Sequence, residues 1–215
     1  MINQPFLYTD EYSKKIIEKI SADDFCGKSW GDEDLADIWA AIKLYYILEQ
    51  NYTCVYCQQI TKSTNGRHWD IEHIISRESA AKFMFESRNL CVTCPDCNIK
   101  KGVSKVTNSK AIRKLPLNSN DYFIIHPHID NYEEHIEVIR VGEFYFAKSE
   151  KGEKTISLCG LNRFYKFVGY DSAVSLDSRI MLLASMISDA KNQAERNDIM
   201  REITTLTLTA LIKEK

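Results

Sequence analysis

The chain has 215 residues, of which 44% are hydrophobic and 27% are charged. These values are close to the averages of soluble globular proteins, so they exclude a disordered, a collagen-like or a small disulfide-rich protein and predict one medium domain or two small ones. The N-terminus lacks the pattern of a signal peptide, and no run approaches the roughly 18 apolar residues of a membrane span. We therefore expect a cytoplasmic protein with no membrane association.

The net charge of −2 hides an uneven distribution. Residues 51–118 carry 11 Lys and Arg against 5 Asp and Glu, whereas residues 1–50 carry 5 against 10. No acidic residue lies between Asp96 and Asp121. The basic residues in this gap are Lys100, Lys101, Lys105, Lys110, Arg113 and Lys114. This basic run predicts a nucleic-acid-binding surface, and the alternative is a solvated, Lys-rich loop.

Two helices are expected in the first fifty residues, over 10–21 and 32–50, with Asp32 as the N-cap of the second. Apolar residues recur at helical spacing along the second helix and predict one buried stripe. The stripe consists of Leu35, Ile38, Trp39, Ile42, Tyr45, Tyr46 and Leu48.

A β-hairpin is expected next. Residues 52–57 and 68–75 are rich in Thr, Val, Tyr, Trp and Ile, and the Asn65-Gly66 turn signal lies between them. A short helix should follow at about 94–101.

The second half of the chain combines expected strands with expected helices. Residues 122–126, 136–148 and 154–159 have a strand-like composition broken by Gly142 and Gly152, which predicts a few antiparallel strands.

The last 40 or so residues predict one or two long amphipathic helices, because apolar residues recur along them. These residues are Val174, Leu176, Ile180, Leu182, Leu183, Met186 and Ile187. The stretch 204–211 is rich in β-branched Thr, which is unusual for a solitary surface helix. We favour packing within the domain, with contact to a partner as the alternative.

Two C-x-x-C pairs, Cys54 with Cys57 and Cys94 with Cys97, predict a metal site. Four thiolates are the number that a closed, tetrahedral structural zinc site needs, and a two-residue spacer lets one turn present both sulfurs to the ion. Cys91 also forms a C-x-x-C with Cys94, but that choice leaves Cys97 unexplained.

The other three cysteines are expected to be buried thiols, because a free cysteine behaves as a small hydrophobic residue. They are Cys26, Cys91 and Cys159.

Several polar residues lie between and beside the cysteine pairs: Glu72-His73, Asn89, and Asn98 directly after Cys97. Together with the cysteines, they resemble the HNH (ββα-metal) endonuclease family over about residues 50–105. Residues 94–101 fit the family pattern C-x-x-C-[HN]-x-x-K without a gap. The resemblance implies an α+β fold: a zinc-stapled, treble-clef-like ββα-metal core with helical N-terminal and C-terminal segments.

The resemblance also implies roles for these residues. His73 would be the general base that activates water, and Glu72 and Asn98 would bind a catalytic Mg²⁺ or Mn²⁺. Asn89 would brace the neighbouring loop and orient the His73 ring. Glu72 and Asn98 replace the Asp and His of the commonest pattern, and both keep an oxygen ligand suited to a hard cation. Asp70 is a reserve ligand two residues before Glu72.

Lys101 lies one helical turn beyond Asn98, where it is either a contact to the substrate phosphate or an ordinary surface lysine. The resemblance implies an HNH endonuclease that hydrolyses phosphodiester bonds, most readily in DNA. One alternative is an HNH nuclease that cleaves RNA, including tRNA. A second alternative is a non-catalytic zinc module that binds nucleic acid through the basic run.

An outer resemblance lies in residues 47–51, 126–130 and 161–163. These segments are similar to HNH proteins that act with ABC-type ATPases in bacterial anti-phage systems of the Septu kind. The similarity implies an ATPase partner and a role in antiviral defence. A second metal site is not expected at His126, His128, Asp130 and His135, because no C-x-x-C pair or acidic cluster completes a ligand shell there.

Four segments describe the expected organisation. Residues 1–50 form an acidic helical segment, and residues 51–115 form the nuclease core with its zinc knuckles. A small β region covers 116–170, and a helical segment covers 171–215.

Overall fold

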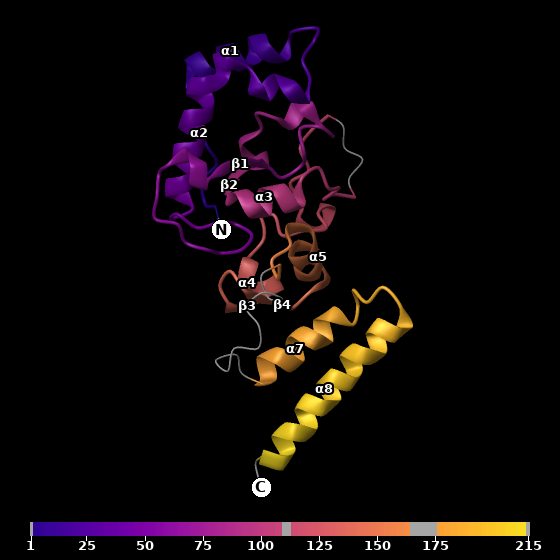
Figure 1. Ribbon diagram of the computed structural model, residues 1–215. Coiled ribbons are helices and arrows are strands. Elements are labelled where there is room, and N and C mark those ends of the chain that lie inside the picture. The colour runs from indigo at the N-terminus through magenta and orange to yellow at the C-terminus, as the bar shows by residue number, and fades with distance from the viewer. Residues whose placement is uncertain (1, 109–112, 164–175, 214–215) are drawn as a thin grey trace.

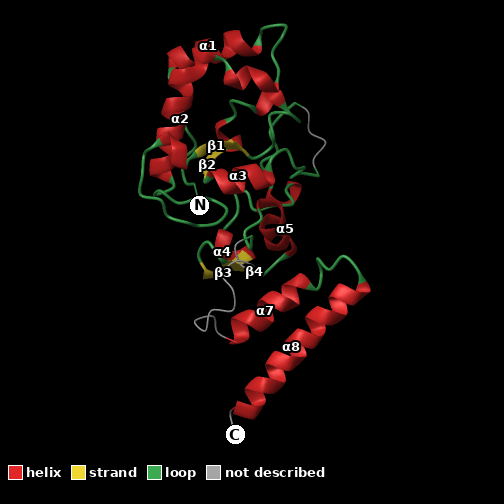
Figure 2. Cartoon of the chain, viewed as in Figure 1, coloured by secondary structure: helices red, strands yellow, loops and turns green. Residues whose placement is uncertain are grey.

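The computed structural model describes residues 2–108, 113–163 and 176–213, so the expectations for Lys110 and Val174 fall outside the described chain. The described part is an α+β structure with two small antiparallel sheets (Figures 1 and 2). The helices are α1 (Asp10–Ile20), α2 (Ala36–Glu49), α3 (Pro95–Lys101), α4 (Tyr132–His135), α5 (Glu150–Cys159), α7 (Leu176–Met186) and α8 (Gln193–Lys213). The strands are β1 (Asp70–His73), β2 (Leu90–Thr93), β3 (Ile136–Arg140) and β4 (Phe144–Ala147).

The elements follow one another along the molecule (Figure 1). Helices α1 and α2 lie at one end, and the β1–β2 sheet and α3 lie in the middle. Helices α7 and α8 pack side by side at the opposite end, where α7 contacts β4. None of the helices within the described ranges is long and apolar enough to cross a membrane.

Helix α1 forms as expected, because Thr9 caps it and Asp10 and Glu11 lie in its first turn, where they complement the helix dipole. The second helix begins later than predicted. Residues 33–35 form a short 3₁₀-helix, and α2 starts at Ala36. The Asp32 side chain does not cap this helix but pairs with Lys19 Nζ at 2.9 Å. The predicted N-cap at Asp32 was therefore wrong.

The buried face of the second helix agrees largely with the predicted stripe. Leu35, Ile38, Ile42 and Tyr46 are fully buried. Leu48, however, is 53% exposed, and its neighbour Ile47 is buried in its place. On a regular helix of 3.6 residues per turn, positions 47 and 48 both lie far from the stripe of 35, 38, 42 and 46, so helical spacing alone does not explain the exchange.

The predicted hairpin of 52–57 with 68–75 was wrong. Strand β1 pairs with β2 instead, and residues 52–57 form turns with an isolated bridge between Thr53 and Ile60. The Asn65-Gly66 signal begins a 3₁₀-turn over Gly66–His68, in which the Asn65 side chain accepts from the Arg67 backbone N–H. The turn that holds Cys54 and Cys57 occupies this short stretch and leaves no room for a strand.

The β1–β2 sheet and α3 form the centre of the molecule. The strands are antiparallel, with Glu72 opposite Cys91 and His73 opposite Leu90. Helix α3 follows β2 after the single residue Cys94, and Pro95 occupies its first position, where the missing N–H costs nothing. The helix contacts β1 and α5. This order places the ends of β1 and α3 beside each other.

The second sheet consists of β3 and β4 alone. Residues 122–126 form no strand and contribute only a bridge between Thr107 and Tyr122. Residues 154–159, predicted as a strand, belong to helix α5. The Ser149 side chain caps this helix by accepting from Gly152 N–H, and Gly160 ends it in the left-handed conformation with φ of 58°.

The C-terminal segment forms two helices, as predicted. In α8, the hydroxyls of Thr204, Thr205 and Thr207 donate to carbonyls four residues earlier, at 2.8–2.9 Å. These bonds give the threonine hydroxyls hydrogen-bond partners inside the helix. Met200 and Leu208 of α8 are exposed.

A continuous hydrophobic core runs from Ile2 to Leu161. Its N-terminal layer approaches the loop after β1 very closely at Gly27. A Cβ atom there would lie 2.8 Å from the Arg77 carbonyl oxygen, so only glycine allows the approach. The approach places Trp30 beside His73, with ring centroids 4.5 Å apart. The predicted domain boundaries stay predictions.

Candidate functional site

The sulfur atoms of Cys54, Cys57, Cys94 and Cys97 all lie within 4.8 Å of one another. The Cys57 and Cys94 sulfurs are 3.8 Å apart. Sulfurs bound to one zinc at about 2.3 Å in a tetrahedron are separated by about 3.8 Å. The four cysteines can therefore hold a structural metal such as zinc.

Local backbone geometry brings the two cysteine pairs together. The first pair lies in a tight turn, in which Gln58 has a positive φ of 56° and its N–H donates to the Cys54 carbonyl. In the second pair, Cys94 is the N-cap of α3 and Cys97 lies in its first turn. Hydrogen bonds from the other three cysteines, that of Cys54 first, hold the pKa of Cys94 well below its ordinary value. A lowered pKa favours the thiolate that binds a metal.

The other cysteines lie outside this cluster. Cys91 is buried in β2 and Cys159 is buried in α5, as expected. Cys26 is exposed, so its predicted burial was wrong. It precedes a short 3₁₀-helix at Gly27–Gly31, on the surface rather than in the core.

A polar pocket of about 250 Å³ lies between the end of β1, the loop that follows it and α3. It brings together residues that the sequence singled out and residues that it did not. From the first group come Glu72, His73 and Asn98. From the second group come Trp30, Ser76 and Arg77. We call this cavity the candidate pocket.

His73 lies at the end of β1 and is 7% exposed. Its Nε2 is 3.2 Å from the Met84 carbonyl oxygen. A carbonyl oxygen only accepts, so this contact assigns the proton to Nε2 and leaves Nδ1 with a free lone pair. Burial lowers the pKa of the imidazole to about 3, and the positive charge of Arg77 adds to the shift.

Asn89 is fully buried just before β2. Its Oδ1 accepts from the Ile75 N–H at 2.7 Å, and its Nδ2 donates to the carbonyls of Ile75 and Phe83 at 3.0 and 3.1 Å. These bonds close the loop between β1 and β2, the loop that also supplies the Met84 carbonyl to His73. Asn89 thus joins the two ends of this loop, and the His73 ring is bonded to Met84.

Glu72 is buried and pairs with an equally buried lysine, Lys101 of α3. The Lys101 Nζ lies 2.5 Å from Glu72 Oε1 and also donates to the His73 carbonyl at 3.1 Å. The Tyr56 hydroxyl donates to the same carboxylate at 3.3 Å. Burial raises the pKa of the Glu72 carboxyl to about 7, although Lys101 and Tyr56 oppose the shift. Lys101 is therefore neither the exposed phosphate contact nor the surface lysine that the sequence left open.

This ion pair makes a direct prediction about stability. Lys101→Met should lower the free energy of unfolding by about 3–5 kcal/mol, because it leaves a buried carboxylate without its counter-charge. The neighbouring Lys100 is exposed. Lys100→Met should therefore change stability by less than about 0.5 kcal/mol. Urea unfolding of both variants tests the prediction, and equal stability of the two would contradict it.

Asn98 faces the other carboxylate of β1. Its Nδ2 donates to Asp70 Oδ2 at 2.9 Å, which leaves its own Oδ1 as an oxygen donor. Within the described ranges, the four cysteines form the only cluster of three or more His, Cys, Asp or Glu ligand atoms. A hard cation beside Asn98 would thus rely on one or two protein oxygens and on water, as Mg²⁺ commonly does.

The basic run is divided by the structure. Lys100, Lys105, Arg113 and Lys114 are exposed, Lys101 is buried, and Lys110 lies outside the described residues. Two further cationic side chains lie in this region. Arg77 lines the candidate pocket, and Lys82 lines a cavity beside it. Sequence reasoning missed both, because they lie in the loop after β1, far along the chain from the run. Their proximity to the Glu72-His73 motif was the available signal.

The residues around His126 hold two parts of the chain together. The Asp130 carboxylate accepts from the His126 N–H at 2.7 Å and pairs with Lys151 Nζ at 3.0 Å. His128 Nε2 lies 2.7 Å from the Leu90 carbonyl oxygen, which ties this segment to β2. His135 Nδ1 contacts Ser149 Oγ at 2.8 Å. In the described structure these residues form no metal cluster.

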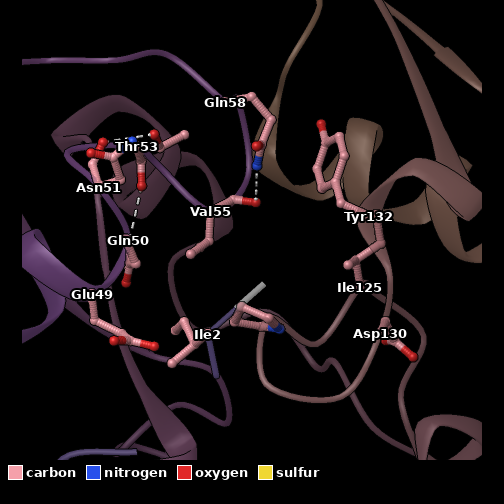
Figure 3. A pocket seen from close by; sticks show the side chains of 11 residues that line it. Ile2, Glu49, Gln50, Asn51, Thr53, Val55, Gln58, Ile125, Asp130 and Tyr132 are labelled. Carbon is pink, nitrogen blue, oxygen red and sulfur yellow. Dashed lines mark hydrogen bonds between the residues drawn. The ribbon is translucent and has the colours of Figure 1, made fainter. Parts of the chain in front are cut away.

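A second polar pocket, also about 250 Å³, lies between the turn after α2 and the segment around Asp130 (Figure 3). Its polar side chains are bonded to the protein itself. Gln58 Nε2 donates to the Val55 carbonyl at 2.9 Å, and Gln50 Nε2 donates to the Thr53 carbonyl at 2.9 Å. None of the candidate catalytic residues lines this pocket.

A comparison with curated proteins finds a distant similarity to the Septu protein PtuB of Bacillus thuringiensis. The two are 29% identical over 129 residues, which is 59% of this chain and 43% of that protein. The chain therefore spans less than half the length of this relative. No protein-family model matches the chain, and no solved structure matches it.

Proposed function

We propose that the protein is a metal-dependent nuclease of the HNH kind, which hydrolyses phosphodiester bonds in nucleic acid, with DNA as the preferred substrate. The observation that carries the proposal is the candidate pocket, in which His73, Glu72 and Asn98 meet at the ends of β1 and α3. The cysteine cluster lies at the start of the same helix. Zinc there would have a structural role, because four protein ligands leave no open position.

In this proposal His73 is the general base. Its Nε2–H bond to Met84 fixes the ring, and the Nδ1 lone pair takes a proton from the attacking water. Asn98 and a carboxylate would hold the divalent cation, and Glu72 is the first candidate for that carboxylate and the partly exposed Asp70 the reserve. A Mg²⁺ or Mn²⁺ held there would offset the charge that develops on the phosphate and the leaving oxygen.

Arg77 is the proposed contact to the substrate phosphate, in place of Lys101. It lines the candidate pocket, and its Nη1 donates to the Gly27 carbonyl at 3.2 Å. This bond anchors one arm of the guanidinium. An arginine suits the task, because its planar fork of N–H donors matches the oxygens of a phosphate.

The proposal places this activity in antiviral defence. Its support is the similarity to a Septu protein together with the Septu-like segments at residues 126–130 and 161–163. An ABC-type ATPase is the proposed partner.

The test is direct cleavage by the purified protein. Plasmid DNA and total RNA are each incubated with the protein and Mg²⁺ or Mn²⁺, with and without EDTA. The same reactions are repeated with ATP and an ATPase that is encoded by a neighbouring gene. Metal-dependent nicking of DNA supports the proposal. Cleavage of RNA alone would favour the RNA nuclease alternative. Salt-sensitive binding without cleavage under any of these conditions would favour the non-catalytic zinc module.

The exposed part of the basic run is expected to bind phosphates without reading bases. Replacing Lys105 and Lys114 by Ala should flatten the dependence of log affinity for duplex DNA on log salt by up to about 2, because each phosphate contact releases condensed counterions. A matched double variant at the exposed Lys14 and Lys154 should keep the parent slope. A salt titration measures both. An unchanged slope for the first variant would show that this run does not contact DNA.

A further inference from the structure

A large cavity lies directly beside the candidate pocket. Its volume is about 860 Å³, within the range of small-molecule sites. One wall is the loop after β1, and the other is the segment that follows α3. The apolar side chains that line it include Ile75, Ala80, Phe83, Val103, Val106 and Pro116. We call it the side cavity.

The side cavity adjoins the candidate pocket. Ser76 and Val103 line both. Ser76 is three residues beyond His73, and Val103 follows the end of α3, which carries Asn98. A molecule that reacts in the candidate pocket therefore has an apolar recess within reach.

The charged groups of the side cavity have one sign. Lys82 and Lys105 line it, and none of the described lining residues is acidic. Both lysines are exposed, and Lys82 Nζ lies 5.1 Å from the centre of the Phe83 ring. An apolar recess with two ammonium groups suits a ligand that combines a flat apolar body with phosphate groups.

We propose that the side cavity binds a nucleobase of the substrate strand, next to the phosphate that is cleaved. This inference rests on the proposed nuclease function. A base inside a stacked duplex cannot enter a cavity, so the nucleotide must be single-stranded or turned out of the duplex. The preferred substrate is then a nucleic acid with an unpaired nucleotide at the cleavage site. Burial of the base would add affinity that does not depend on salt.

The test measures binding in the absence of cleavage. The protein carries His73→Ala, and the probes are a short single strand of oligodeoxythymidine and an abasic strand of equal length and charge. We expect the strand with bases to bind about tenfold more tightly than the abasic strand. Equal affinities would overturn the proposal.

Two variants that fill the cavity locate the effect. Ser104→Phe on one wall and Ser79→Phe on the other should each bring the two affinities together, mainly by weakening the strand with bases. The matched control is Val141→Phe, an exposed residue in the turn between β3 and β4. It should keep the tenfold ratio. Zinc content and circular dichroism establish that each variant is folded. Because the two substitutions lie on different walls, one can still test the proposal if the other variant does not fold.

The outcomes separate this proposal from the nuclease function. If the ratio persists in both folded variants, the bases bind elsewhere and the side cavity is not their site. If the wild-type protein binds the strand with bases and the abasic strand equally, and the cavity-filling variants no longer bind an ATPase partner, the cavity is a protein-docking site. The proposal is then overturned. If the wild-type protein cleaves nothing but the ratio appears and is lost in the variants, the nuclease function fails and the nucleobase site stands.

Discussion

His73→Ala should lower metal-dependent cleavage by about 10²–10⁴, the range for loss of a general base. The geometry behind this expectation is specific. Nε2 is engaged by the Met84 carbonyl, so Nδ1 is the ring atom left to accept a proton, and His73 lines the same pocket as Glu72 and Asn98. Initial rates on plasmid DNA, at saturating Mg²⁺ or Mn²⁺ and matched protein concentration, measure the effect.

The control for this variant must separate lost chemistry from lost packing, because the His73 ring is buried against Trp30. His73→Asn retains a polar side chain there and should lose as much activity as His73→Ala. The exposed His68 precedes the same strand, and His68→Ala should leave the rate unchanged. Full activity in a folded, zinc-loaded His73→Ala protein would refute the role of His73.

Contacts set by short sequence spacing were predictable from the sequence. Two residues between the cysteines of each pair specify a tight turn, so the cluster of Cys54, Cys57, Cys94 and Cys97 follows from spacing and residue type. Helix α3 follows from the proline and the N-cap position before it. Both features depend on residues that are close together in the sequence.

Contacts between distant segments were not predictable in the same way. Strand β1 could pair with any strand of suitable composition, and the nearest one in sequence was the wrong choice. The observed partner is β2, and the register between the two is fixed by a loop that Asn89 braces with three buried hydrogen bonds. No periodicity in either strand contains this information.

The burial of Lys101 has a similar origin. A lysine at the end of a short helix reads as exposed, because a lone ammonium is costly to bury. Glu72, 29 positions earlier, compensates the charge, and only the packing of α3 on β1 brings the two together. Helix α5 is a different case, because the sequence does contain the capping residues that predict a helix there. Ser149, the acidic residues Glu150 and Glu153, and Gly160 mark both of its ends.

Loss of the metal from the cysteine cluster should have the largest effect on the fold. The purified protein should contain about one zinc per chain, and Cys97→Ser should yield a protein that lacks zinc and is largely insoluble. Thiolate ligands bind zinc as part of folding, and the ion here would join the turn after α2 to the start of α3. A strong chelator should accordingly lower the melting temperature of the wild-type protein by many degrees.

Cys91→Ser is the matched control, since Cys91 is buried only a few residues away but lies outside the cluster. It should keep its zinc and lose about 1–3 kcal/mol of stability, because a hydroxyl replaces a thiol in an apolar site. Elemental analysis and thermal unfolding of both variants decide the matter. If Cys91→Ser loses the zinc while Cys97→Ser retains it, the ligand set is wrong. If neither variant nor the wild-type protein contains metal, the cluster is held by packing alone, and the zinc assignment fails.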